Sequence, residues 1–287
     1  MPGIWTDEQV ASWREVTQAV HSKGSFIFLQ LVRTGAMGRQ LASSMGATIQ
    51  APETADVPDK MGKLDFERMR EDYVKASMRA IDAGFDGVEL HACNGDVLQE
   101  FLSINYNTRT DEYGGSINGH ARFVLEVIDS IIKAIGVDRI ALRVGPYGTQ
   151  GNMTQGISPI PQYSYLVSEL ERRAQEKNER LAYLHLIEPR AKWHGEEGKE
   201  EWEPDYSLSD FVRQIWTGPL VRCGMLGKRV DEFVEKDERT LVAVGRSFIS
   251  NPDLVRRIQD GLPFEPYDRP TFYRNPAFPP CEGLHGL

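Results

Sequence analysis

The stretch Gly87-Val88-Glu89-Leu90-His91-Ala92-Cys93-Asn94-Gly95-Asp96 joins a hydrophobic run to a cluster of polar side chains. The run predicts a strand over residues 86–92, covered on both faces as in a parallel sheet. At its end, His91 and Asn94 are two donors that can hold the same carbonyl oxygen, in the manner of an oxyanion hole. The alternative is a turn with a satisfied histidine and an Asn that caps the following helix.

Helices and strands alternate on both sides of this stretch. Thr6-Asp7-Glu8-Gln9 has the spacing of a capping box and predicts a helix that ends at Gly24. Apolar periodicity then predicts further helices over residues 65–83, 118–135, 161–177, 207–216, 229–236 and 251–260. Short apolar runs predict strands over residues 25–32, 86–92, 139–144, 181–187, 220–223 and 240–244.

This alternation is typical of an α/β fold with a parallel sheet, either doubly wound or closed into a TIM-type (β/α)8 barrel. Polar residues in or just after several strands favour the barrel, where they converge on one end; these are Gln30, His91, Arg143, Glu188 and Arg246. We expect one domain over residues 1–287 with about six βα units. The first two strands of such a barrel have no counterpart.

An incomplete barrel would leave two sheet edges open. Open edges invite pairing with another chain, so a homodimer is one expectation. An irregularly closed barrel or an N-terminally truncated chain would equally account for a count of six strands.

Composition excludes several classes of partner. The 287 residues are 40% hydrophobic, with a net charge of -9 and a pI of about 5.3, and they contain no basic stripe for nucleic acid or an anionic membrane. A small-molecule ligand is therefore expected. Three widely spaced cysteines fit neither a disulfide framework nor a zinc site, and the N-terminus does not resemble a signal peptide. We expect a cytoplasmic, unprocessed protein without a metal.

Two further groups are candidate ligands of an anion. Arg143 lies in an apolar strand, so it must bind something anionic or form an ion pair, with Glu89 as the candidate partner. Gly245-Arg246 follows the last predicted strand and suits a phosphate, with backbone NH groups of Cys223-Gly224 beside it.

Other polar residues fit structural roles. His185 alternates with leucines and is predicted to lie in the core, and Cys93 has no base near it in the sequence. Five glutamates at 196, 197, 200, 201 and 203 lie between or beside Trp193 and Trp202, which indicates a solvated surface or a lid.

The chain resembles the old yellow enzyme family of FMN-dependent ene-reductases, especially its fungal members. The resemblance extends from Pro2 to about Tyr273. It is most specific in Asn107-Thr108-Arg109-Thr110-Asp111-Glu112-Tyr113-Gly114-Gly115-Ser116-Ile117 and in Gly245-Arg246-Ser247-Phe248-Ile249-Ser250-Asn251-Pro252-Asp253-Leu254. The family is a TIM barrel that binds FMN across the carboxyl ends of its strands.

The resemblance implies roles for the residues that match. Gln30 and Arg143 would contact the flavin ring, and Gly224, Gly245 and Arg246 would hold its phosphate. His91 and Asn94 would bind the carbonyl oxygen of an enone or enal, with Tyr273 as a further substrate contact. NADPH would serve as the reductant, and the setting would be fungal specialised metabolism.

The chain departs from the family pattern at several positions. Asp96 occupies the place of the Tyr that usually donates the proton. Aspartate carboxyls in water are ionised at neutral pH, with a reference pKa of about 3.9, so Asp96 can donate a proton only if burial raises its pKa by several units. Otherwise solvent supplies the proton, or the residue acts as a base in a changed reaction. Val32 replaces an aromatic residue, and Met225 an Asn.

Three hypotheses follow. The chain is an FMN-dependent reductase of activated C=C bonds; or a flavin-free isomerase or cyclase that uses His91, Asn94 and Asp96; or an inactive, truncated family member.

Overall fold

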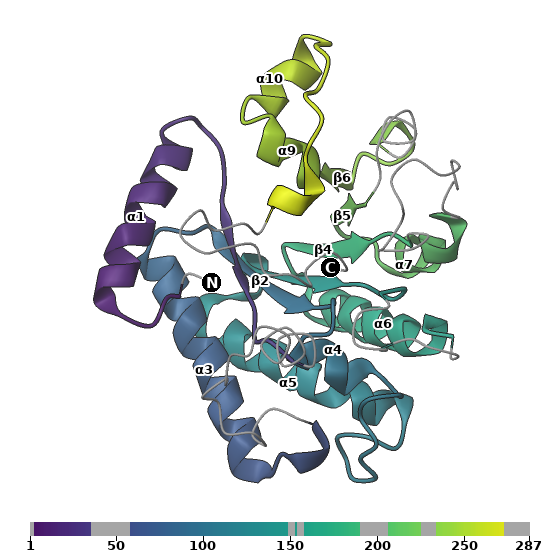
Figure 1. Cartoon of the computed structure of the whole chain (residues 1–287). Coiled ribbons are helices and arrows are strands. Elements are labelled where there is room, and N and C mark those ends of the chain that lie inside the picture. Colours follow the sequence, from purple (N-terminus) through teal and green to yellow (C-terminus); the bar gives the residue numbers. More distant parts are fainter. Residues whose placement is uncertain are drawn as a thin grey trace.

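The computed structural model describes residues 3–35, 58–148, 153, 158–189, 206–224 and 234–272. Within these ranges, six parallel strands form one sheet in chain order (Figure 1). A doubly wound sheet would reverse its order at a switch point, whereas a barrel adds each strand beside the previous one. The barrel-type order is confirmed. The strands are β1 Phe28–Leu31, β2 Gly87–Ala92, β3 Ile140–Val144, β4 Tyr183–Ile187, β5 Leu220–Cys223 and β6 Thr240–Ala243.

The longer helices pack against one another in chain order outside the sheet, and α9 and α10 lie apart from them at the top of Figure 1. The α-helices are α1 Asp7–His21, α3 Lys63–Asp82, α4 Val97–Leu102, α5 Ile117–Ile135, α6 Ile160–Lys177, α7 Asp210–Ile215, α9 Arg246–Ser250 and α10 Leu254–Gln259. Short 3-10 helices are η1 Pro58–Lys60, η2 Val137–Arg139, η4 Tyr206–Ser209 and η5 Arg269–Thr271.

The first helix begins as predicted. The Thr6 hydroxyl accepts from the Gln9 backbone at 3.3 Å, and Gln9 Oε1 accepts from the Thr6 backbone at 3.1 Å, which completes a capping box. Val10 on this helix is buried, whereas Val16 is 41% exposed. Gly24 closes the following turn in the left-handed region, with φ of 73°.

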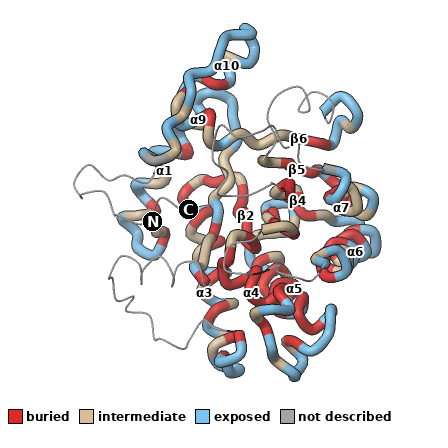
Figure 2. Tube along the Cα trace, turned by 45° about the vertical axis from the view of Figure 1, so that its right-hand side comes forward, coloured by how far each residue is buried: buried red, intermediate tan, exposed pale blue. Residues whose placement is uncertain are grey.

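The two faces of the sheet differ in polarity. One face is apolar and packs into the hydrophobic core, with Leu90, Leu142 and Leu184 among its fully buried side chains. Burial is densest around β2, α4 and α5, whereas α10 is largely exposed (Figure 2). Because side chains alternate along a strand, the residues directly before and after each of these leucines face the opposite side of the sheet. That opposite face is polar, and it contains the candidate site.

Strands β1 and β6 are the two edges of the described sheet. On β6, Leu241 is 57% exposed, as expected of a strand with a neighbour on one side only. No helix in the described ranges is both long and apolar enough to cross a membrane.

Candidate functional site

The turn after β2 fixes the geometry of the predicted carbonyl clamp. Asn94 and Gly95 adopt left-handed conformations with φ of 57° and 81°, which glycine and asparagine tolerate best. They turn the chain from β2 into α4, whose N-cap residue is Asp96. The Asp96 carboxylate makes no capping hydrogen bond to α4, although aspartate is among the best caps. The carboxylate is used elsewhere.

That carboxylate faces His91. Asp96 Oδ2 lies 2.7 Å from His91 Nδ1, and both side chains are buried. The contact is short, but its angle is poor for a hydrogen bond. On the other side of the ring, Nε2 lies 3.3 Å from Asn94 Nδ2 and 3.3 Å from Cys93 Sγ. The structure therefore brings His91, Asn94 and Asp96 together, with Asp96 only 7% exposed rather than open to solvent.

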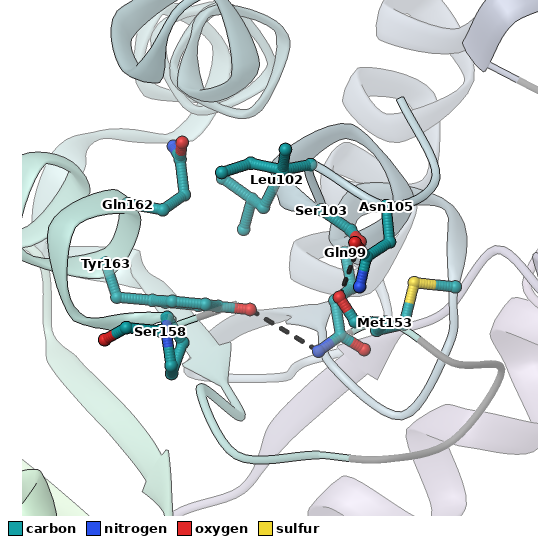
Figure 3. Close-up of a pocket in the computed structure, with 10 residues that line it drawn as sticks. Gln99, Leu102, Ser103, Asn105, Met153, Ser158, Gln162 and Tyr163 are labelled. Atoms are coloured by element: carbon teal, nitrogen blue, oxygen red, sulfur yellow. Dashed lines mark hydrogen bonds between the residues drawn. The ribbon is translucent and has the colours of Figure 1, made fainter. Parts of the chain in front are cut away.

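Gln99 on α4 stabilises this turn through hydrogen bonds to two backbone groups. Its Oε1 accepts from the Gly95 backbone at 2.8 Å, and its Nε2 donates to the Gly145 carbonyl at 3.2 Å. Nε2 also lies 3.4 Å from the Tyr163 hydroxyl, at a cavity of about 30 Å³ between α4 and α6 (Figure 3). Such a cavity has room for water but not for a cofactor. This cavity lies behind the turn and is too small to be the substrate pocket.

A row of polar side chains crosses the face of the sheet beside His91. Glu89 accepts a hydrogen bond from Gln30 Nε2 at 2.5 Å and lies 2.8 Å from His185 Nδ1, two strands away. Ala141 is the register partner of Glu89 on the intervening strand, and its small side chain leaves room for that contact. Burial raises the pKa of Glu89, but His185 and Gln30 outweigh it, so the pKa lies below its ordinary value.

Arg143 lies next to His91 and His185 in the strand register. Its Nη2 is 3.7 Å from Cys223 Sγ, and its buried Nε has no hydrogen-bond partner within the described ranges. Burial lowers the pKa of Arg143, but neighbouring thiols and Glu89 raise it overall. The predicted alternative, a direct ion pair with Glu89, is absent from the described part of the chain.

The proposed phosphate residues lie at neighbouring strand ends. Cys223 and Ala243 are register partners on β5 and β6, so Gly224 and Gly245 follow adjacent strands. Gly224 has φ of 96°, and a Cβ at Gly245 would meet nothing within 4 Å, which leaves its backbone accessible. The guanidinium of Arg246 contacts the Tyr267 hydroxyl at 3.5 Å.

Other sequence-based expectations need correction. Glu188 does not join the polar face, because it is buried in an ion pair with Arg222. Arg222 is the register partner of Leu186, which belongs to the hydrophobic core. His185 is buried as predicted, but it belongs to the polar row and not to the apolar core. Tyr273, Met225, Trp193, Trp202 and the glutamate-rich loop lie outside the described residues.

Known proteins resemble this chain over most of its length. Residues 1–265 match the sequence profile of the NADH:flavin oxidoreductase / NADH oxidase family. The chain belongs to this family. Among curated relatives, enoate reductase 1 of Kluyveromyces lactis is 39% identical over 299 residues, which cover 96% of this chain and 74% of the relative. A "probable inactive dehydrogenase" of Claviceps purpurea, easA, is 36% identical, with 99% and 75% of the two chains covered.

A solved structure of the family has the same fold. The old yellow enzyme of Pichia sp. AKU4542 superposes with a TM-score of 0.78 and 37% identity, covering 94% of this chain and 72% of the other. This NADH:flavin oxidoreductase family member is therefore an oxidoreductase of the old yellow enzyme type, and the family implies FMN as cofactor.

Proposed function

We propose that this protein is an FMN-dependent reductase that uses NADPH to reduce the activated C=C bond of an α,β-unsaturated ketone or aldehyde. One observation carries the proposal: Arg143, with a buried, unpartnered Nε, lies beside the paired donors His91 and Asn94 on a polar face of the described sheet. An enoate reductase among the fungal relatives supports this reaction, and their organisms support a fungal setting.

The polar face fits a flavin. Arg143 offers a buried positive charge and an Nε donor, which suits a planar, electron-accepting ring whose charge becomes negative on reduction. Gln30 would contact the same ring, and Gly224, Gly245 and Arg246 would hold the phosphate at the ends of β5 and β6. Bound FMN would supply the hydride that reaches the β-carbon of the substrate.

His91 and Asn94 would hold the carbonyl oxygen. Their nitrogen atoms Nε2 and Nδ2 are 3.3 Å apart, so one oxygen that lies to the side of both can be at hydrogen-bond distance from each. Hydrogen bonds to that oxygen draw electrons from the conjugated C=C bond and stabilise the negative charge that develops during hydride addition. The clamp therefore activates the alkene and fixes its orientation.

Asp96 would position His91 in this reaction. Its carboxylate lies 2.7 Å from His91 Nδ1 and is buried, so it is not available as a base for the substrate. Contact with Nδ1 directs the opposite nitrogen, Nε2, toward the substrate side. The proton for the α-carbon would then come from solvent.

Product analysis tests the reaction. With FMN, NADPH and 2-cyclohexenone, we expect cyclohexanone to form in proportion to NADPH consumed, with no product when either FMN or NADPH is omitted. The double variant His91→Ala/Asn94→Ala should still bind FMN but lose most of this turnover. Conversion of an enone to a rearranged product without FMN and NADPH would instead support the isomerase or cyclase.

Three expectations from the sequence stay predictions: a single domain over residues 1–287, homodimerisation, and location in the cytoplasm. Size-exclusion chromatography with light scattering would decide the second.

A further inference from the structure

A second group of interacting polar side chains lies on the polar face, around the partly exposed Cys223. On β4, the His185 Nδ1 atom is 2.8 Å from Glu89 Oε2, which fixes the ring. His185 is 9% exposed, and its other nitrogen, Nε2, interacts with Cys223 without a well-aligned hydrogen bond to any described residue. Arg143 Nη2 approaches the same sulfur at 3.7 Å. A thiol, an imidazole oriented by a carboxylate and a guanidinium thus converge from four neighbouring strands.

This surrounding favours a thiolate. Burial raises the pKa of Cys223, but His185 and Arg143 outweigh burial, so the pKa lies below its ordinary value. Thiolates, not thiols, are the nucleophilic form of cysteine. Cys223 is also partly exposed, so a reagent can reach it.

Cys93 provides an internal comparison. It too lies near an imidazole, 3.3 Å from His91 Nε2, but it is completely buried. Burial is the largest influence on the Cys93 thiol and raises its pKa. Cys93 should therefore stay protonated and unreactive under the same conditions.

We propose that Cys223 is a covalent modification site for soft electrophiles of the α,β-unsaturated carbonyl class. The sulfur attacks the β-carbon and forms a C–S bond, the π electrons of the C=C bond move to the carbonyl oxygen, and the α-carbon of the enolate takes a proton from water. The adduct is a thioether, and no oxidant or reductant is consumed. The choice of an enone rests on the proposed function, whereas the reactivity of the thiolate does not.

The test uses the full chain with Cys281→Ser, so that Cys93 and Cys223 are the two remaining cysteines. Iodoacetamide and methyl vinyl ketone are added separately at neutral pH, and labelled sites are identified by peptide mass spectrometry. We expect one addition with each reagent, at Cys223 and not at Cys93, and none in the Cys223→Ser variant. Arg143→Met should slow labelling roughly tenfold, because less of the sulfur is thiolate.

The arms of this experiment separate the two proposals. Labelling of Cys93 as fast as Cys223, no labelling of Cys223 by iodoacetamide, or an unchanged rate in Arg143→Met would overturn the reactive thiolate. Labelling by iodoacetamide without an enone adduct would overturn the assignment of the electrophile. Saturating FMN should protect Cys223. If protection fails while the adduct forms, the placement of FMN is wrong and the modification site stands.

Discussion

Two histidine–carboxylate pairs lie on the polar side of the sheet at nearly equal distances, but only the His185–Glu89 pair is aligned as a hydrogen bond. His91 Nδ1 is 2.7 Å from Asp96, and His185 Nδ1 is 2.8 Å from Glu89. All four side chains are buried. In each pair the other ring nitrogen is directed toward the region where chemistry is proposed: the substrate carbonyl for His91, and a thiol for His185.

The pairs differ in their neighbours. Cys93, beside His91, is fully buried, and its pKa is raised. Cys223, beside His185, is partly exposed and lies against the Arg143 guanidinium, and its pKa is lowered. Proximity to an imidazole does not by itself activate a thiol. At Cys223, His185 and Arg143 together outweigh burial, whereas at Cys93 burial prevails although Arg143 lowers the pKa there too.

Removing the carboxylate of Glu89, in the second pair, should have the largest effect, and the quantity affected is the stability of the fold. The Glu89 carboxylate accepts hydrogen bonds from both His185 and Gln30, and Glu89→Gln replaces it with a neutral amide that has one oxygen. We expect the free energy of unfolding to fall by about 1.5–3 kcal/mol, since hydrogen bonds to charged groups are worth that much. Glu71→Gln is the matched control, because Glu71 forms an exposed pair with Lys75, and it should change stability by less than about 0.5 kcal/mol. If urea unfolding showed the same loss of stability in Glu89→Gln and Glu71→Gln, the stabilising role of the Glu89 carboxylate would be contradicted.

The effect of Glu89→Gln should depend on pH. The pKa of Glu89 is lowered by folding, so its stabilisation is present above the ordinary value of 4.5 and is lost as pH falls through the folded pKa. The pKa of His185 is raised, so its stabilisation is present below 6.5 and is lost as pH rises through the folded pKa. The stability difference between wild type and variant should therefore be largest between pH 4.5 and 6.5. A difference that grows from pH 7 to pH 9 would contradict this.

Arg143→Met removes the positive charge that lies between the two pairs in the strand register and contacts Cys223. We expect FMN to bind roughly 10–100-fold more weakly, because a charge-assisted hydrogen bond contributes about 1.5–3 kcal/mol. Arg143→Lys keeps the charge and should recover part of the affinity. The measurement is a flavin fluorescence titration, and unchanged FMN affinity in Arg143→Met would show that the flavin is held elsewhere.

Asp96→Asn changes the first pair alone and should have the smallest effect. An outer contact that orients a functional imidazole contributes about tenfold, so we expect the enone KM to rise or kcat to fall by about that factor. FMN affinity should be unchanged, because Asp96 contacts His91 and not the proposed flavin residues. A loss of FMN binding in parallel with activity would assign Asp96 a general structural role.

Most of the fold could be predicted from the sequence because its signals are local. Apolar runs place β2 and β5 within a residue of their observed bounds, and the capping box at Thr6 marks the start of α1. The short helix α9 is not predicted, since five residues are too few to show a helical repeat. The sequence indicates a helix at α4 only as one that Asn94 would cap, whereas its N-cap residue is Asp96.

The site could be predicted where a polar residue interrupts an apolar strand, as His91 and Arg143 do. The Cys223 constellation could not, because its members come from β2 to β5 and meet only through the strand register. The prediction for Glu188 is wrong because it rests only on the position of this residue after a strand; the alternation of Leu184 and Leu186 places Glu188 on their face of the sheet, where it pairs with Arg222. Gln30, a polar residue inside an apolar strand, is explained by its bond to Glu89.

The most direct test of the central claim is a visible absorption spectrum of the purified protein after incubation with FMN and gel filtration. We predict that flavin elutes with the protein at about one per chain, that NADPH bleaches its absorbance without oxygen, and that 2-cyclohexenone restores it. A protein that unfolds cooperatively yet elutes without flavin would contradict the account.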